Sequence, residues 1–146
     1  MWIEQLITSF VASGAFGILF NAPKKSLLKC GFVGMVGWMV YIVFVEINLD
    51  VILATFIASF FIASISQFFA KIYKTPSIIF SVAGIIPLVP GGLAYDAMRN
   101  IVTNDYNVAI QLGVKVFLIS GAIAIGLVFS EVANQLVMKA QAQGNK

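Results

Sequence analysis

The chain has 146 residues, of which 60% are hydrophobic and 10% are charged. Water-soluble domains carry about 25% charged residues, so this composition excludes an ordinary globular domain and indicates a protein that is solvated by lipid. The formal net charge of +3 does not indicate nucleic-acid binding, because the basic residues are scattered singly or in pairs between apolar runs. One cysteine and no histidine exclude an internal disulfide and the usual zinc sites, and no cofactor is expected.

Crossing the hydrocarbon core of a bilayer takes about 20 helical residues. Five apolar stretches meet this length, and they cover approximately residues 5–22, 26–45, 51–70, 76–103 and 107–138. We therefore expect one all-α domain over residues 1–146, a polytopic membrane helix bundle with five transmembrane helices. The N-terminus lacks the basic segment of a secretory signal, so the first stretch is interpreted as a retained helix.

The charges between the spans predict their orientation. Lysines follow the first, third and last spans, whereas the segment after the second span carries Glu46 and Asp50. Basic segments stay on the cytoplasmic side of a membrane. The N-terminus is therefore expected outside and the C-terminus in the cytoplasm.

Rows of small residues predict where the spans contact one another, because helices in lipid associate through close backbone approach. The rows are Gly31, Gly34 and Gly37 in the second span, Thr55, Ser59 and Ala63 in the third, and Ala122, Gly126, Ser130 and Asn134 in the fifth. We interpret these rows as helix–helix contacts rather than solute contacts. Asn21, beside Pro23 at the end of the first span, is interpreted as a helix cap.

The fourth span is interrupted by Pro87, Pro90, Gly91 and Gly92. Prolines remove backbone donors, and glycines permit conformations that other residues avoid. The helix before the break would rise about 16 Å, roughly half of the membrane. Free backbone near the midplane is tolerated only against protein or a water-filled cavity, so these four residues are candidate substrate-binding residues. The alternatives are a proline kink and a helix end near the outer surface.

A polar stripe follows the break. Gly92, Asp96, Arg99, Asn100 and Thr103 fall on one side of a helix whose other sides are apolar. A guanidinium beside a new helix N-terminus suits a carboxylate, because both supply positive potential and donors. Arg99 and Asn100 are therefore further candidate substrate-binding residues. The alternative is an amphipathic helix at the outer interface.

The fifth span contains two charges, Lys115 and Glu131. They are sixteen positions apart, which is about 24 Å along a helix, so they cannot pair with each other. Lys115 is interpreted as a side chain that snorkels to the membrane surface. Glu131 has a shorter reach, and together with Asp96 it is a candidate for carrying a coupling proton.

Catalytic motifs are absent from the sequence. No histidine can serve as a general base, and no metalloprotease, nucleophile-elbow or phosphate-loop motif occurs. We therefore expect no enzyme activity.

Three segments resemble the threonine/serine exporter family. They are the run from Phe16 to Lys25, the run from Cys30 to Trp38, and the part from Pro76 to Tyr106, above all Ile85 to Tyr95 with Met98 and Asp105 after it. The resemblance covers nearly the whole chain and is to the C-terminal module of the family, in its small-subunit form. It implies a multi-pass subunit in a bacterial cytoplasmic membrane, whose partner is a larger membrane subunit of five helices arranged with it as an inverted repeat.

The resemblance also implies export of threonine and serine driven by the proton gradient. A two-subunit relative implies the alternative of a dicarboxylate exporter of the succinate type, and Asp96 departs from the basic or neutral residue of many relatives. A non-transporting scaffold subunit and a passive channel are further alternatives. The expected partners are the larger subunit, an amino-acid or carboxylate substrate and the lipid bilayer. The chain could also form a homo-oligomer with copies of itself. No nucleic-acid partner is expected.

Overall fold

The computed structural model describes residues 1–144, and these form helices joined by short turns. The helices are α1 (Trp2–Leu19), η1 (Lys24–Ser26), α2 (Leu27–Glu46), α3 (Val51–Tyr73), α4 (Ser77–Ile85), η2 (Ile86–Leu88), α5 (Gly91–Val102) and α6 (Tyr106–Gly144), where η marks a single 3-10 turn. The prediction of an all-α fold is confirmed.

Four stretches are long and apolar enough to cross a membrane: α1, η1 with α2, α3, and α6. The fifth candidate is a bent pair, in which Ser77–Leu88 and Gly91–Val102 meet at an angle of 51°. The chain is therefore a multi-pass membrane protein, and the predicted interruption of the fourth span is present. Its orientation stays a prediction, because helix length and composition do not distinguish the two sides of a membrane.

Four of the helices end at a residue in the left-handed conformation. These residues are Asn21, Asn48, Lys74 and Asn104, with φ from 50° to 64°. Asparagine tolerates this conformation better than most residues, and it terminates a helix by turning the chain. After α1, the amide of Ala22 donates to Gly17 O at 2.9 Å. Asn21 is therefore part of a helix cap, as predicted, and α1 lies three residues earlier than the expected span.

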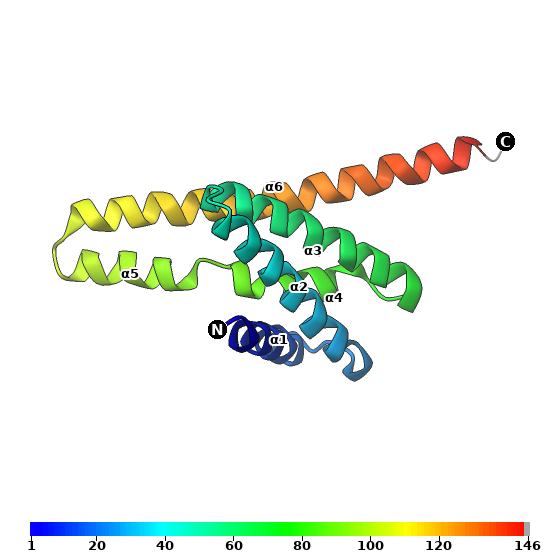
Figure 1. Ribbon diagram of the computed structural model, residues 1–146, viewed down its shortest axis with the longest axis horizontal. Coiled ribbons are helices and arrows are strands. Elements are labelled where there is room, and N and C mark those ends of the chain that lie inside the picture. Colours follow the sequence, from blue (N-terminus) through cyan, green and yellow to red (C-terminus); the bar gives the residue numbers. More distant parts are fainter. Residues whose placement is uncertain (145–146) are drawn as a thin grey trace.

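The half-length helix α4 lies at the centre of the bundle. α1, α2 and α3 pack around it, and α6 packs along α3 (Figure 1). Phe80 and Ala83 of α4 are fully buried, and they form the core together with Val33 of α2 and Ile62 of α3. One face of this short helix is thereby buried in the core, while Ile78 on another face is exposed.

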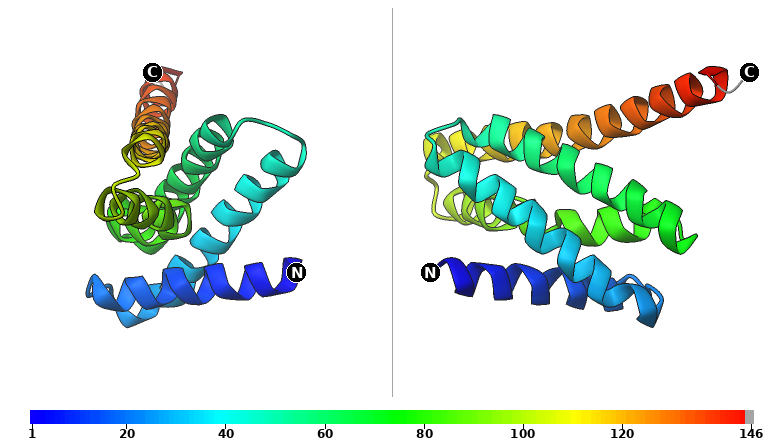
Figure 2. Two further views of the ribbon diagram at one scale, coloured as in Figure 1. Left: turned by 90° about the vertical axis from the view of Figure 1, so that its left-hand side faces the viewer. Right: turned by 45° about the vertical axis from the view of Figure 1, so that its right-hand side comes forward.

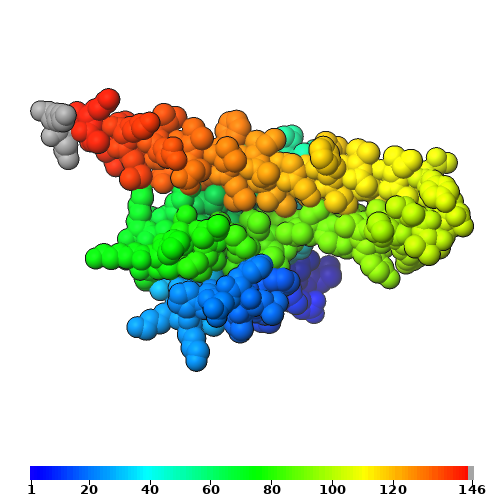
Figure 3. Space-filling view, turned by 180° about the vertical axis from the view of Figure 1, so that it is seen from behind, coloured from blue at the N-terminus to red at the C-terminus, as the bar shows by residue number. Residues whose placement is uncertain are grey.

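The helices fan out instead of running parallel. α1 lies steeply inclined to α6, which is seen nearly end-on in the left view of Figure 2. α5 and the start of α6 form a hairpin that extends past the ends of α2 and α3 (Figure 1). α6 runs along one side of the molecule, and its outer face is uncovered (Figure 3). Phe117, Val128 and Leu136 are exposed on α6, so this helix offers an apolar surface to lipid or to another chain.

The predicted rows of small residues in α2, α3 and α6 are buried, apart from half-buried Asn134. At Gly34, a Cβ atom would collide with the side chain of Ser13 in α1. At Gly126 of α6, a Cβ atom would come within 2.8 Å of the backbone oxygen of Phe56 in α3. At Gly34 and Gly126 the predicted helix–helix contacts are present, whereas Thr55 and Ala63 of the α3 row also line cavities.

We expect Gly126→Ala to weaken the packing of α6 on α3, because the added methyl group would meet backbone atoms that cannot turn away. Overpacking costs about 1–3 kcal/mol, against a gain of about 1 kcal/mol when alanine replaces a helical glycine. Thermal unfolding of the purified protein in detergent should therefore show a lower midpoint. Gly121→Ala is the matched control, since no atom lies within 4 Å of its Cβ position. Equal midpoints for the two variants would contradict the close contact.

Candidate functional site

The interruption between α4 and α5 is a short stretch of turned backbone. Val89 is extended, and Pro90 bends the chain with φ −79° and ψ 50°. The amide of Gly91 donates to Val89 O at 2.8 Å, whereas the amides of Gly92 and Leu93 have no hydrogen-bond partner within residues 1–144. α5 therefore begins with free donors, at the end where the helix dipole is positive.

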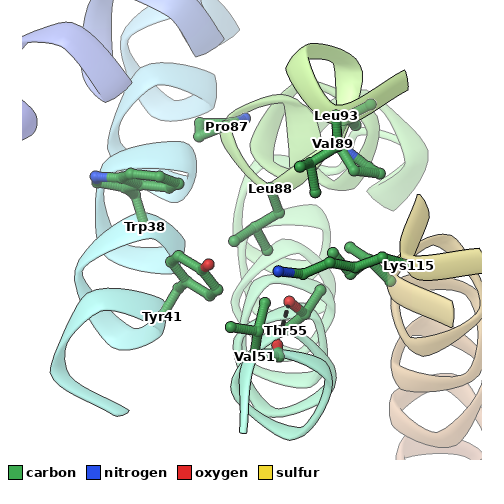
Figure 4. Close-up of a pocket in the computed structure, with 11 residues that line it drawn as sticks. Trp38, Tyr41, Val51, Thr55, Pro87, Leu88, Val89, Leu93 and Lys115 are labelled. Atoms are coloured by element: carbon green, nitrogen blue, oxygen red, sulfur yellow. Dashed lines mark hydrogen bonds between the residues drawn. The ribbon is translucent and has the colours of Figure 1, made fainter. Parts of the chain in front are cut away.

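A cavity of about 230 Å³ lies against this interruption, and we call it the break cavity (Figure 4). Its walls come from segments far apart in the sequence. Trp38 and Tyr41 belong to α2, Val51 and Thr55 belong to α3, and residues 87–90 form the break itself. The wall is mostly apolar and aromatic with a few polar groups, which is the usual composition of a small-molecule site.

The break cavity lies nearer one end of the bundle than its middle. Tyr41 is five residues before the end of α2, and Thr55 is four residues after the start of α3. At 1.5 Å per residue, both are within about 8 Å of their helix ends. The reason is that α4 and η2, with nine and three residues, together rise about 18 Å, more than half of a membrane. The cavity therefore lies toward one end of the bundle, and the position near the bilayer midplane stays a prediction.

Lys115 supplies the charge of the break cavity. Its side chain reaches from α6 into the cavity, with the ammonium among Leu88, Tyr41 and Thr55 (Figure 4). Thr55 Oγ1 donates to Val51 O at 2.7 Å, so its lone pairs remain able to accept a hydrogen bond. No acidic residue is found among the described residues that line the cavity. A cation close to the positive end of α5 attracts an anionic group such as a carboxylate.

Four of the predicted site residues lie at the interruption. Pro87 and Pro90 line the break cavity. Gly91 and Gly92 are exposed, have ordinary φ angles, and leave open space where a Cβ would be. The turn therefore does not need glycine for its conformation. The lack of side chains here leaves the first turn of α5 uncovered.

Arg99, Asn100 and Asp96 lie on α5, outside the lining of the break cavity. Arg99 is exposed, while Asp96 and Asn100 are half-buried. Asn100 Nδ2 donates to the backbone oxygen of Asp96 at 2.8 Å. α5 packs against α6 and buries Ala97, so the packing divides the polar stripe into a half-buried part and an exposed part.

Glu131 lies toward the other end of α6, and Gln67 Nε2 of α3 donates to its Oε2 at 2.8 Å. The sixteen residues between it and Lys115 correspond to about 24 Å along the helix. Asp96, in contrast, belongs to the hairpin at the opposite end of the bundle. The structure does not bring the two candidate proton carriers together.

Sequence reasoning named Lys115 and Thr55 without placing either in a site, and it did not name Tyr41. A signal existed for Lys115, because an ionisable residue inside a membrane span is a functional candidate by default. Its side chain lines the break cavity and is also exposed, so the snorkelling interpretation stays a prediction (Figure 4). No local signal places Tyr41 and Thr55 in one cavity, since that depends on how α2, α3 and α6 pack.

Comparison with known proteins gives a family and a distant relative. The model of a family described as Threonine/Serine exporter, ThrE, matches residues 5–133. An uncharacterized protein of Haemophilus influenzae is 32% identical over 99 residues, which are 68% of this chain and 33% of the relative. The chain thus spans about a third of the length of that relative. No solved structure matches the chain.

The reactivity of a cysteine at position 93 should show whether the break cavity contains water. In a Cys30→Ala background, we expect Leu93→Cys to react with a charged, membrane-impermeant thiol reagent, because the reactive thiolate forms in water and not in lipid. Val128→Cys is the matched control, since Val128 is exposed and apolar on α6. It should react roughly tenfold more slowly or not at all. Equal rates at the two positions would contradict a water-filled cavity.

Proposed function

We propose that this chain, which belongs to the threonine/serine exporter family, is one subunit of a proton-coupled exporter of threonine and serine. The observation that carries the proposal is the ammonium of Lys115 in a small cavity at a broken membrane helix. Broken helices place free backbone groups beside the solute in many transporters. A cation in a partly apolar cavity matches the carboxylate of a short amino acid.

In this proposal, Lys115 binds the substrate carboxylate. The amides of Gly92 and Leu93 add donors and the positive end of the α5 dipole. A hydrogen bond to a charged group contributes about 1.5–3 kcal/mol. A few such bonds hold a small zwitterion loosely, and loose binding suits a transporter, which must also release its substrate.

The rest of the break cavity fits a short hydroxy amino acid. Thr55 Oγ1 can accept a hydrogen bond from the substrate hydroxyl, and Leu88 and Trp38 offer apolar contact. The volume of about 230 Å³ lies below the roughly 300–1,000 Å³ of sites for drug-sized ligands. A succinate-type dicarboxylate would need a second cation, and Lys115 is the one basic residue among the described residues of the lining.

The exposed part of α5 would face the larger subunit. We place that subunit of five helices against this side as the other half of an inverted repeat, which completes the path at the interface. Arg99 and Asn100 would then guide the substrate carboxylate toward Lys115. The relative from Haemophilus influenzae supports such an arrangement, because the matched segment is 33% of its length and the remainder can hold further helices.

The coupling proton would be carried by Asp96 or Glu131, since a carboxyl group at membrane depth can bind a proton and release it. The lysine pattern assigns the break cavity to the outer side of a bacterial cytoplasmic membrane and Glu131 to the cytoplasmic side. The two candidate proton carriers would therefore lie at opposite ends of the path.

Lys115→Gln should reduce threonine and serine efflux about tenfold or more, in cells that express the chain together with its larger subunit. The reason is the loss of a charge-assisted bond of about 1.5–3 kcal/mol, where 1.4 kcal/mol is a factor of ten. Lys115→Arg should retain part of the activity. Lys139→Gln is the matched control, because Lys139 is exposed near the end of the same helix. Unchanged efflux in Lys115→Gln and in Arg99→Ala, with the two subunits still co-purifying, would favour a scaffold role.

Uphill export should also stop when the proton gradient is collapsed. The measurement uses liposomes that contain both subunits and labelled threonine, serine or succinate. Threonine and serine should leave against their gradients only while a proton gradient is present. Efflux that ignores the collapse would indicate a passive channel, and preferential efflux of succinate would indicate a dicarboxylate exporter.

A further inference from the structure

A second cavity, of about 270 Å³, lies between α3, α4 and α6, and we call it the serine cavity. Ser66 and Gln67 of α3, Ser77 and Ser81 of α4, and Glu131 of α6 form its polar wall. Gln67 is six residues before the end of α3, so this cavity and the break cavity lie at opposite ends of the bundle. Its lining holds a carboxylate and, among the described residues, no lysine or arginine.

Neutral amides hold the carboxylate of Glu131 in place. Gln67 Nε2 donates to Oε2 at 2.8 Å, and Gln135 Nε2 donates to Oε1 at 3.2 Å. The lysine on the next turn of α3, Lys71, donates to Asn134 Oδ1 at 3.2 Å instead. A carboxylate offers about four acceptor positions, so Glu131 can accept further hydrogen bonds. Its negative charge faces the cavity without a cation from the lining.

The serine hydroxyls add acceptors rather than donors. Ser81 Oγ donates to Ser77 O at 3.2 Å, and Ser66 Oγ donates to Ile62 O at 2.7 Å. Because the hydroxyl protons of Ser66 and Ser81 are used within their own helices, the lone pairs of these two oxygens remain for a ligand. A carboxylate together with serine oxygens that can accept hydrogen bonds suits a positively charged group with several donors. A primary ammonium has one positive charge and three donors.

We propose that the serine cavity binds the ammonium group of the exported amino acid, with Glu131 as the counter-ion. This inference rests on the proposed function and adds a second recognition site to it. Lys115 and Glu131 are about 24 Å apart along α6, so one small amino acid cannot contact both. The substrate is recognised by its ammonium at one end of the bundle and by its carboxylate at the other.

In this proposal, the proton and the substrate ammonium compete for the same carboxylate, that of Glu131. Protonated Glu131 is neutral and no longer attracts an ammonium, so the proton and the substrate bind in turn. The groups around Glu131 are the amides of Gln67 and Gln135 and the serine hydroxyls of α4. The ammonium of Lys71 lies one helical turn further along α3, where it donates to Asn134 Oδ1. Glu131 is the one carboxylate among the described residues that line the cavity, so the exchange of proton and substrate is assigned to it.

The test uses 1-amino-2-propanol, which has an ammonium and no carboxylate, and lactate, which has a carboxylate and no ammonium. Ser81→Cys in a Cys30→Ala background is labelled with N-ethylmaleimide, in membranes that contain the chain and its larger subunit. A probe at about ten times its Kd leaves roughly a tenth of the sites free, so labelling should slow about tenfold. We expect this protection from 1-amino-2-propanol and none from lactate.

Glu131→Gln should abolish the protection, because the amide keeps the shape of the side chain and loses its charge. Lys115→Gln is the matched control and should leave the protection unchanged, since it lies in the break cavity. Ser77→Cys provides a second reporter on the same wall if Ser81→Cys does not fold. Protection that persists in Glu131→Gln, or equal protection by lactate, sodium or potassium, would overturn the ammonium site.

Labelling does not require transport, so the two proposals can fail separately. Threonine efflux without protection by 1-amino-2-propanol would overturn the ammonium site alone. Protection that depends on Glu131, in a protein complex that exports neither threonine nor serine, would support the ammonium site and overturn the exporter assignment.

Discussion

Backbone groups inside a bilayer must find their hydrogen-bond partners within the protein, and this constraint governs the centre of the molecule. Pro87 and Pro90 stop α4 before it has crossed the bundle, so the chain must satisfy a helix end away from bulk water. α1, α2 and α3 enclose α4, and the bond from Gly91 to Val89 closes the turn. Two amides at the start of α5 remain free beside the break cavity. The cavity therefore follows from the interruption.

Small residues allow the helices of the bundle to pack closely against one another. Gly34 admits Ser13, and Gly126 lets α6 approach the backbone of α3. This approach makes α3 and α6 a shared wall of both cavities, with polar groups of α3 in each. Between them, Ile62 and Ile123 are buried in the apolar core. Buried apolar side chains thus lie between the two polar cavities.

The sequence predicts the helices and the interruption well, because both depend on local properties. Apolar stretches of sufficient length mark the spans, and Pro87 and Pro90 mark the break regardless of what surrounds them. The cavities depend on packing, which a single sequence does not give. Lys115 could be recognised as an unusual charge, but its partners Tyr41 and Thr55 come from other helices. The depth of the break in the bilayer stays a prediction, because it depends on how the whole bundle sits in the membrane.

α6 is one uninterrupted helix, and Lys115 and Glu131 lie on either side of its contact with α3 at Gly126. If α6 tilted as a rigid body about this contact, one cavity would become narrower while the other became wider. Gly126 is eleven residues from Lys115 and five from Glu131, so the two arms measure about 16 Å and 8 Å. A given tilt would move Lys115 about twice as far as Glu131. Rocking of a single helix would then open the two sides of the molecule in alternation.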